Sequence, residues 1–576
     1  MKRTGKGLIS ICVMLAMVLG LSFAGQAMYQ QPEVPYFPDE FEELPEEMLE
    51  FFPDPDVEIN SPYFMDDMRE SFTTHDEMME FLYDLKAISN RFQMRIIGQS
   101  QEGRALPLLV FNEEGLIHPA DLRSQNKPTV WLHGKVHGNE PAATEGMLAV
   151  AHDLAVTDWG EEMLENVNVL IMPMPNPDGA YYFQRATANQ IDINRDHMKL
   201  TLPETRAMHN AYNEYKPHVA VDNHELGAVP DEEWLEEFNI IDTTADVYTL
   251  SPRNANVPRE IIDVADDLFR ANVEEALAAE GLRHRDYTIG ERIEDGKPTA
   301  NTGGFTSVIG RNAMALVPSF SFLVETPQSG DYFYPRRVYS HIITNKSFVE
   351  TAANHSAYVL DIIEGAREET ARLGAEVCED DKIAVEQERV PFDVVWEFID
   401  VEKNEIIEMD VTLYDHPEPV LERVRPYAYI FPPAYHNIAE RLKFGGAEVR
   451  RLAEAVDLEV EALELVDSDV STSYYEGHFR KWVEMEKFET EKFFPAGSYV
   501  VRMDQPYGNA IVEMMEPETW ASFVTYNFIP LGERGDEYPV YRLMDDDIHL
   551  NTHIVESVPD FMDYHYGRSL FFGDPR

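Results

Sequence analysis

Between residues 74 and 374 the sequence alternates short apolar runs with longer amphipathic segments, and this alternation constrains the fold more than any other feature. The runs ALPLLVF, PTVWL, VNVLIMPM, HVAVDN and NAMALVPSFSFLV have the length and composition of buried strands. The segments between them, among them PAATEGMLAVAHDL, PETRAMHNAYNEY and VPREIIDVADDLFRANVEEALAAEG, have the pattern of helices. The alternation predicts an α/β domain in which helices flank a mixed or largely parallel central β-sheet.

The ends of this domain are indicated by helix-capping signals and by a change in the sequence pattern, from alternating strands and helices to mainly strands. Thr74 is placed to cap a helix over HDEMMEFLYDLKAIS, and the helix TNKSFVETAANHSAYVLDIIEGAREETARL closes the domain, which we place at residues 70–375. After Cys378 the runs VPFDVVWEFIDV, EIIEMDVTLYD, GSYVVRM and NAIVEMM are typical of strands, with a helix expected at YHNIAERLKF. We therefore expect a β-rich accessory region of one or two modules over residues 385–576.

The first 27 residues have the pattern of an export signal. Lys2, Arg3 and Lys6 precede an apolar run over residues 8–23, which small residues follow. The run is short for a retained membrane anchor, so we predict a secreted, extracellular protein with no stable membrane association after cleavage. Residues 28–69 are acidic and proline-rich, and are predicted to form an arm; whether this arm is a propeptide is left open.

The charge balance limits the classes of partner. The chain has 105 acidic and 47 basic residues, a net charge of −58. Such a surface repels phosphates, which excludes nucleic acid as an expected partner. Because the acid is spread along the whole chain, it is interpreted as a solvated surface suited to salty or alkaline water.

Two histidines and a glutamate follow two of the expected strands. The loop after PTVWL contains His137 and Glu140 as an H-x-x-E pair, and HVAVDNHE places His224 at another strand end. Ligands in open α/β sheets bind at strand carboxyl ends, and two histidines with one carboxylate leave a tetrahedral zinc one open position for water. His133, four residues before His137, is the rival ligand; that spacing would pair the two on a helix, but this segment is leaving a strand, so His133 is given a packing role or a role behind the ligands.

A second cluster follows VLIMPM, where an NPDG turn leads into a loop that carries Arg185, Asn194 and Arg195. An arginine near zinc can stabilise a developing oxyanion, and another can hold a carboxylate through two parallel hydrogen bonds. The alternative is that these arginines merely pair with the abundant surface acid. Their place between two segments that carry possible ligands favours the site.

A third signal is Glu325, at the end of the apolar run ALVPSFSFLVET. A partly buried carboxylate near zinc can take a proton from water and pass it to a leaving amine. The alternative is an exposed glutamate at the end of a strand.

The segments IIGQSQEGRALPLLVF, HGNE, NPDG, INRD, VDNH and FLVET, in this order over roughly residues 74–370, resemble the zinc carboxypeptidase family, which includes the pancreatic carboxypeptidases. The resemblance implies an α/β fold with a mixed central sheet, one zinc ion per chain and peptide or protein substrates. It assigns the zinc to His137, Glu140 and His224, the general base to Glu325, and the role of polarising the scissile carbonyl to Arg185. It also implies that Asn194 and Arg195 grip the C-terminal carboxylate and that Arg104 lines the substrate groove.

The sequence departs from the family pattern in two places. The family places a substrate-binding tyrosine shortly before a Gly-rich segment that resembles Gly303-Gly304; Tyr287 is near but at the wrong spacing. The stretch from Gly304 to Glu325 is longer than in the pancreatic enzymes and contains Arg311. The sequence therefore does not predict which C-terminal residue the protein prefers. Two alternatives stay open: a zinc amidase for cell-wall peptides or N-acyl amino acids, and a non-catalytic binding protein that keeps the fold.

Overall fold

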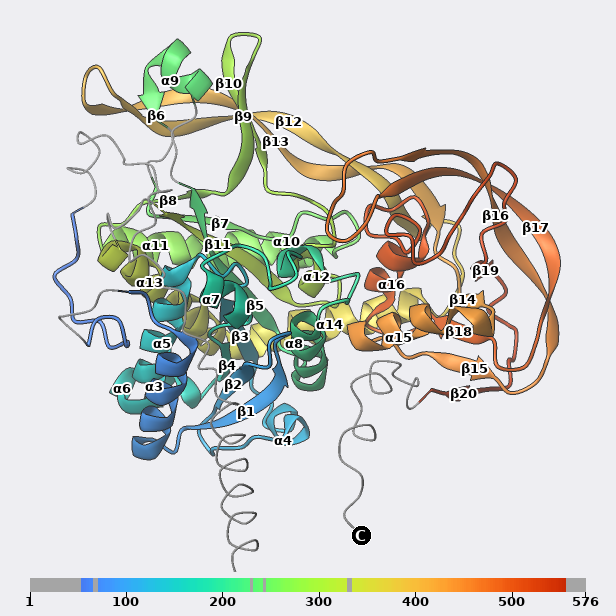
Figure 1. Ribbon diagram of the computed structural model, residues 1–576, viewed down its shortest axis with the longest axis horizontal. Coiled ribbons are helices and arrows are strands. Elements are labelled where there is room, and N and C mark those ends of the chain that lie inside the picture. Colours follow the sequence, from blue (N-terminus) through green and yellow to red (C-terminus); the bar gives the residue numbers. More distant parts are fainter. Residues whose placement is uncertain (1–52, 66–70, 228–231, 242–244, 329–333, 556–576) are drawn as a thin grey trace, which may run out of the picture.

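The computed structural model describes residues 53–65, 71–227, 232–241, 245–328 and 334–555, which form an α/β body and a C-terminal region beside it (Figure 1). We call residues 71–375 the α/β body and residues 382–555 the C-terminal region. The export signal predicted at residues 1–27 and most of the predicted arm lie outside the described residues. No helix in the described ranges combines the length and the apolar character that a membrane span needs.

An eight-stranded mixed sheet forms the centre of the α/β body, as predicted. Its order is β1-β2-β4-β3-β5-β11-β7-β8. The four strands β4, β3, β5 and β11 run parallel to one another, whereas the pairs β1–β2, β2–β4 and β7–β11 are antiparallel. The bounds are β1 (Phe92–Gln99), β2 (Ala105–Phe111), β3 (Thr129–Gly134), β4 (Asn168–Met172), β5 (Val219–Gly227), β7 (Val247–Leu250), β8 (His284–Asp286) and β11 (Phe320–Gln328).

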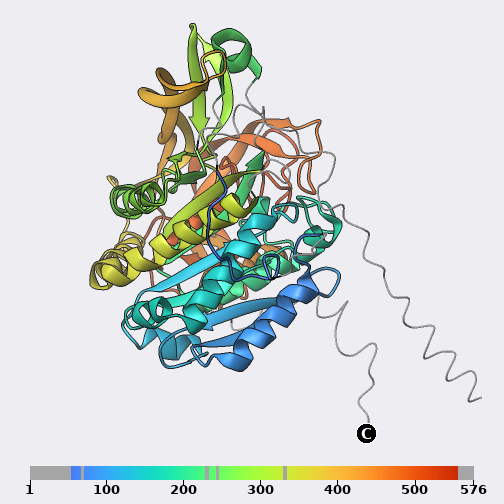
Figure 2. The same cartoon turned by 90° about the vertical axis from the view of Figure 1, so that its left-hand side faces the viewer.

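Helices cover both faces of this sheet (Figures 1 and 2). In β3, Val130 and Leu132 pack in the apolar cluster that includes α3 (His75–Ile88), α5 (Pro141–Val156) and α13 (Tyr334–Asn354). Trp131 between them points to the other face, where it packs with α8 (Pro203–Tyr215). Because successive side chains alternate between two covered faces, the central strands are apolar throughout, which is why they were recognisable in the sequence. Shorter helices are α4 (Pro119–Arg123), α6 (Asp158–Leu164), α7 (Pro177–Tyr182) and α10 (Arg259–Val264), which continues into α11 (Ala271–Ala279).

The helix start predicted at Thr74 is confirmed. The Thr74 hydroxyl accepts a hydrogen bond from the Glu77 backbone N–H, and the Glu77 carboxylate accepts one from the Thr74 N–H at 2.8 Å. This reciprocal capping box satisfies two backbone donors that the first helical turn leaves free.

Three predicted elements differ in the structure. NAMALVPSFSFLV is not one strand: α12 (Gly310–Ala315) comes first and β11 begins at Phe320. The closing helix breaks at His355 into α13 and α14 (Ser356–Leu373). NAIVEMM is a helix, α16 (Gly508–Met515), and the prediction of a strand was wrong. All eight residues of α16 are buried, so no polar face reveals its helical period.

The C-terminal region is β-rich, as predicted. β12 (Lys382–Asp400) and β13 (Glu405–Val424) pair along their length and join β6 (Ile240–Ile241), β9 (Thr288–Glu294) and β10 (Lys297–Thr302) in a five-stranded sheet. A seven-stranded sheet has the order β17-β16-β19-β14-β18-β15-β20. Its bounds are β14 (Ala428–Phe431), β15 (Arg450–Leu452), β16 (Val456–Val470), β17 (Lys481–Phe494), β18 (Tyr499–Arg502), β19 (Tyr541–Leu543) and β20 (Thr552–Ile554), and α15 (His436–Gly445) packs beside it. The first of these sheets therefore joins strands of the α/β body to strands of the C-terminal region.

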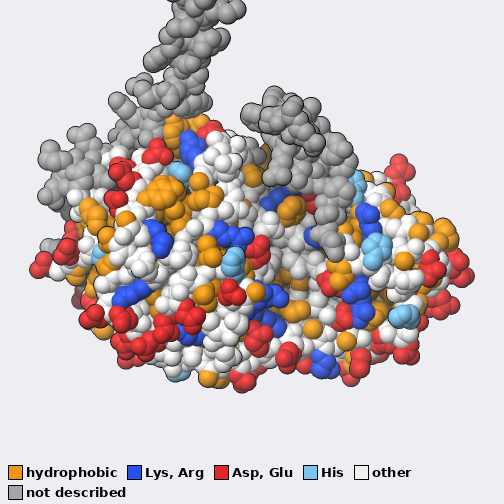
Figure 3. Space-filling model, turned by 90° about the horizontal axis from the view of Figure 1, so that it is seen from below, with side chains coloured by type: hydrophobic (Ala, Val, Ile, Leu, Met, Phe, Trp, Pro, Cys, Tyr) orange, Lys and Arg blue, Asp and Glu red, His pale blue; other side chains and the backbone are white. Residues whose placement is uncertain are grey.

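The surface agrees with the spread of acid along the chain. In Figure 3, acidic side chains lie over the visible face and are dense along its lower edge.

Candidate active site

The carboxyl ends of the central parallel strands bring the predicted residues together. The loop after β3 carries His137 and Glu140, and β5 carries His224. β5 and β11 are paired in parallel with His224 directly opposite Glu325. The register of these strands, which no local motif fixes, therefore places the expected base beside an expected ligand.

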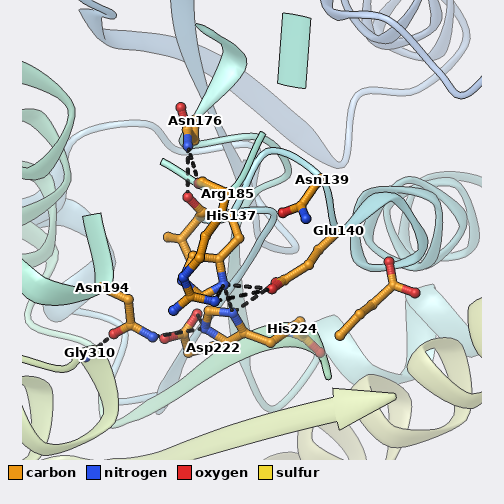
Figure 4. A network of polar contacts seen from close by, with 12 residues as sticks. His137, Asn139, Glu140, Asn176, Arg185, Asn194, Asp222, His224 and Gly310 are labelled. Atoms are coloured by element: carbon orange, nitrogen blue, oxygen red, sulfur yellow. Dashed lines mark hydrogen bonds and ion pairs between the residues drawn. The ribbon is translucent and has the colours of Figure 1, made fainter. Parts of the chain in front are cut away.

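His137, Glu140 and His224 converge on one point (Figure 4). All three are buried, and one ligand atom of each lies within 4.8 Å of the other two. His137 Nδ1 is 2.6 Å from a Glu140 oxygen, and His224 Nδ1 is 3.0 Å from the other. A zinc ion is bound at about 2.0–2.2 Å from nitrogen and oxygen ligands, so this donor set fits one zinc ion.

Two buried aspartates orient the two histidine rings. Asp192 Oδ1 is 3.2 Å from His137 Nε2, and Asp222 Oδ1 is 2.8 Å from His224 Nε2. A carboxylate that accepts the Nε2 proton leaves the Nδ1 lone pair to face a metal. His133 lies 3.1 Å from Asp222 and is not one of the three residues that converge, a position that agrees with the role predicted for it.

Charges of opposite sign compensate for the burial of this cluster. Burial raises the pKa of Glu140, but the charges of His137 and His224 lower it by more than burial raises it, and the result is a pKa of about 2. Burial lowers the pKa of His224, but Asp222 and Glu140 outweigh it and raise the pKa well above its ordinary value. Burial likewise raises the pKa of Asp192, but the cationic His137 and Arg185 outweigh burial and hold this pKa well below its ordinary value. A cluster this dense in opposite charges is typical of functional sites.

Arg185, Asn194 and Arg195 lie at the edge of the cluster. The Arg185 guanidinium donates to Asp192 at 2.9 and 3.1 Å and is half exposed, so part of it stays open to a ligand. Asn194 accepts from the Gly310 N–H at 2.7 Å, and its Nδ2 is 3.2 Å from His224 Nε2. Arg195 donates to the Asn194 carbonyl at 2.7 Å and has no carboxylate within 4.0 Å among the described residues. The carboxylates of Asp192 and Glu476 interact with Arg195 only at longer range, so no ion pair in the described chain occupies its guanidinium.

Glu325 is buried, with 7% of its surface exposed, and its Oε2 has no hydrogen-bond partner among the described residues. Burial raises its pKa; the cationic His224 opposes this and Glu140 adds to it, and the result is a pKa of about 8. A carboxyl group that takes up and releases a proton near neutral pH is suited to general acid–base chemistry.

Arg104 is engaged by other groups. It lies 2.5 Å from Asp178 and 2.7 Å from Glu102, and its guanidinium lies over the Tyr181 ring. The role in substrate binding implied for it stays a prediction.

The structure also shows where the departures from the family pattern lie. Tyr287 packs against Gly303, where an added Cβ would lie 2.8 Å from the tyrosine ring. Burial and then the Glu325 carboxylate raise the pKa of Tyr287, which places it near the expected base. Arg311 is buried and donates to the Gly304 carbonyl at 2.6 Å. Both residues therefore belong to the neighbourhood of the site.

Asp192 and Asp222 were not singled out from the sequence. Each stands two residues before a chosen residue, Asn194 and His224, in the patterns D-x-N and D-x-H. Ligand histidines usually donate their second N–H to a carboxylate or a carbonyl, so nearby aspartates were a usable signal.

Comparison with known proteins agrees with this geometry. The sequence profile of the zinc carboxypeptidase family matches residues 78–250. "Carboxypeptidase 2" of Trichophyton tonsurans is 33% identical over 485 residues, which cover 82% of this chain and 86% of that protein. "Carboxypeptidase 2" of Trichophyton rubrum is 32% identical with the same coverage, and "Carboxypeptidase SOL1" of Arabidopsis thaliana is 28% identical over 25% of this chain and 31% of its own.

The fold and the buried His-Glu-His cluster define a metal-dependent hydrolase, and the comparisons specify which kind. The chain belongs to the zinc carboxypeptidase family and is a zinc-dependent metallocarboxypeptidase. The family resemblance predicted from its motifs is confirmed.

Proposed function

We propose that this protein releases single residues from the C-termini of peptides, with zinc held by His137, Glu140 and His224 and with Glu325 as the general base. The observation that carries the proposal is the register of β5 and β11, which sets Glu325 beside His224, next to an arginine without a carboxylate partner in the described chain. Glu325 and the His-Glu-His cluster lie at the carboxyl ends of the central strands, and the loop that carries Arg195 lies beside them, which supports the proposal.

Each side chain has a definite task in this proposal. Zinc, when bound, supplies a Lewis acid that activates water and polarises the scissile carbonyl. Glu325 takes a proton from the attacking water and delivers it to the nitrogen of the leaving amine. Arg185 donates hydrogen bonds to the carbonyl oxygen as it becomes negative. Arg195, with Asn194, holds the terminal carboxylate and so selects the end of the chain.

We also propose that the enzyme acts outside the cell. This rests on the basic residues and the apolar run at the start of the sequence. Sequencing the N-terminus of the protein recovered from the culture medium tests it: a mature chain that starts near Gly25 or Met28 is expected, and an intact Met1 would contradict it.

The role of Arg195 gives the sharpest test of the reaction. Wild type and Arg195→Ala are compared on a matched pair of peptides, one with a free C-terminal carboxylate and one with an amide. Because the carboxylate is present in both the ground state and the transition state, we expect Arg195→Ala to raise KM for the free acid more than it lowers kcat. The preference for the acid over the amide should disappear.

Arg372, exposed on α14, provides a control in which Arg372→Ala leaves both peptides unaffected. Equal cleavage of acid and amide by wild type would contradict the proposal and favour the amidase reaction. Zinc binding without cleavage of any peptide would favour the binding protein.

A further inference from the structure

A turn of the C-terminal region has an unusual backbone. Residues 475–478 lie in the middle of the connection between β16 and β17, which spans residues 471–480, and we call them the Glu476 turn. Tyr475 and His478 exchange backbone hydrogen bonds of 2.8 and 2.9 Å, and Glu476 and Gly477 between them have φ of 49° and 90°. Two successive positive φ values are typical of a two-residue hairpin turn, and a glutamate seldom adopts the first of them. The strained position therefore suggests a task for the Glu476 side chain.

The turn is held firmly within its own region. The His478 ring packs edge-on against Tyr526 and Phe528, with ring centroids 5.5 and 5.2 Å away. The Arg480 guanidinium lies 4.0 Å from the centre of the Tyr475 ring. These contacts fix both flanks of the turn, so it can act as a rigid support.

The Glu476 turn contacts the loop that carries the site residues of the α/β body. The Glu476 carboxylate accepts a hydrogen bond from the Asp192 backbone N–H at 2.8 Å, across 284 residues of sequence. The Glu476 carbonyl accepts another from the buried Lys199 ammonium at 3.0 Å. Arg441 of α15 donates to the Leu200 carbonyl at 3.2 Å. The C-terminal region thus holds the loop of residues 183–202 at its middle, through Asp192, and near its end, through Lys199 and Leu200.

Asp192 is the point at which this support reaches the chemistry. Its side chain contacts His137 Nε2 at 3.2 Å, Arg185 at 2.9 Å, and the Asn194 backbone N–H at 2.7 Å. A shift of Asp192 therefore moves three groups together. They are the metal ligand His137, Arg185, which is proposed to bind the carbonyl, and Asn194, which is proposed to bind the terminal carboxylate. Only Glu476 accepts a hydrogen bond from the Asp192 N–H among the described residues.

We propose that Glu476 is a positioning residue for the active site, so that the C-terminal region is part of the catalytic unit. The proposal deepens the carboxypeptidase function and rests on it. Without the Glu476 acceptor, the Asp192 N–H loses its partner in a half-buried place and the loop relaxes. The Asp192 carboxylate then no longer holds His137 and Arg185 in line, although neither residue is changed.

The test uses the full chain and three variants: Glu476→Ala removes the acceptor, Glu476→Gln keeps an amide oxygen in its place, and Asp469→Ala removes an exposed acid of the same hairpin. Zinc affinity is measured by competition with a chromogenic chelator, and kcat and KM are measured on a free-acid peptide. Changing a residue that orients metal ligands typically costs about 10- to 100-fold in metal affinity or activity. We expect such a loss in both measurements for Glu476→Ala, recovery close to wild type in Glu476→Gln, and no change in Asp469→Ala.

Recovery by Glu476→Gln distinguishes positioning from a general loss of folding, which thermal melting curves of all four proteins would reveal. Glu476→Ala matching Asp469→Ala in both measurements would overturn the proposal, and so would equal losses in Glu476→Ala and Glu476→Gln. Zinc competition needs no substrate. A wild type that binds zinc but cleaves no peptide would therefore refute the proposed reaction, while the effect of Glu476 on the metal site would still be measured.

Discussion

The α/β body and the C-terminal region contribute to one site in different ways. The body supplies its residues at the ends of adjacent parallel strands, in short motifs such as HGNE and VDNH. The C-terminal region supplies Glu476 from a hairpin turn with no motif, 284 residues from its partner. The pair His137 and Glu140 depends on a fixed local spacing, whereas Glu476, which supports a loop, needs only to present one acceptor in the right place.

The largest effect is expected from a ligand in the body. His224→Ala leaves two ligands, which hold zinc poorly, so the variant should lose its metal on dialysis against a chelator and show no measurable hydrolysis. His355→Ala, at an exposed position between α13 and α14, is the matched control and should keep one zinc per chain. Elemental analysis and peptide assays measure both. A metal-free His224→Ala variant with full activity would refute the site.

The next effect concerns the base. Glu325→Gln keeps the shape of the side chain but accepts no proton. We expect zinc content and KM to stay near wild type while kcat falls about 10²- to 10⁴-fold, the usual contribution of general acid–base catalysis. Steady-state kinetics on the free-acid peptide decide this. A kcat that is unchanged would assign the proton transfer to another group.

How far the sequence predicted this site depends on the kind of contact. His137, Glu140, His224 and Glu325 were predicted because apolar strands and polar strand ends are local patterns. The contacts of Asp192 and Asp222 needed the loop geometry and the register of β3 against β5, although the local D-x-N and D-x-H patterns were present.

The remaining differences have the same physical origin. The helix α16 was predicted as a strand because complete burial removes the amphipathic period from which secondary structure is predicted. Glu476 was not recognised at all. The letters E-G between two strands indicate a tight turn, but the partner of that turn depends on how two regions pack. Tertiary packing, which no local pattern encodes, decided each of these cases.

A smaller effect concerns the free energy of unfolding of the metal-free protein, which the ionised Glu325 carboxylate lowers. Its folded-state pKa of about 8 lies above the ordinary 4.5, so the folded state keeps a proton that the unfolded state releases. The contribution of Glu325 to the free energy of unfolding is fully present below about pH 4.5. It is lost as the pH rises towards 8, by at most about 5 kcal/mol. Glu325→Gln carries no such charge. With zinc removed, it should therefore melt at a similar temperature to wild type at pH 5 and at a higher one at pH 8.5. Scanning calorimetry at the two pH values measures this, and a difference that does not change with pH would contradict the raised pKa.

The smallest effect is expected from salt, and it should separate the two regions. In the β16–β17 hairpin, exposed acids stand directly opposite one another at Glu459 and Glu491, Glu464 and Glu486, and Asp467 and Glu484. Like charges in such positions repel, by about 0.2–1 kcal/mol for each pair. Raising the ionic strength from 0.1 to 1 M shortens the screening length from about 10 to about 3 Å, which should relieve this repulsion.

Hydrogen–deuterium exchange resolves the two regions in one experiment. We expect exchange in β16 and β17 to slow in 1 M salt, while exchange in the buried strands β3 and β5 changes little. Glu459→Lys places opposite charges across one pair, so it should slow exchange of the hairpin at low salt and weaken the response to added salt. If the hairpin exchanges at the same rate at both ionic strengths, repulsion between its acids does not destabilise it.

Because the Glu476 turn lies at the end of this hairpin, the same increase in salt should also tighten zinc binding slightly in wild type and less in Glu476→Ala.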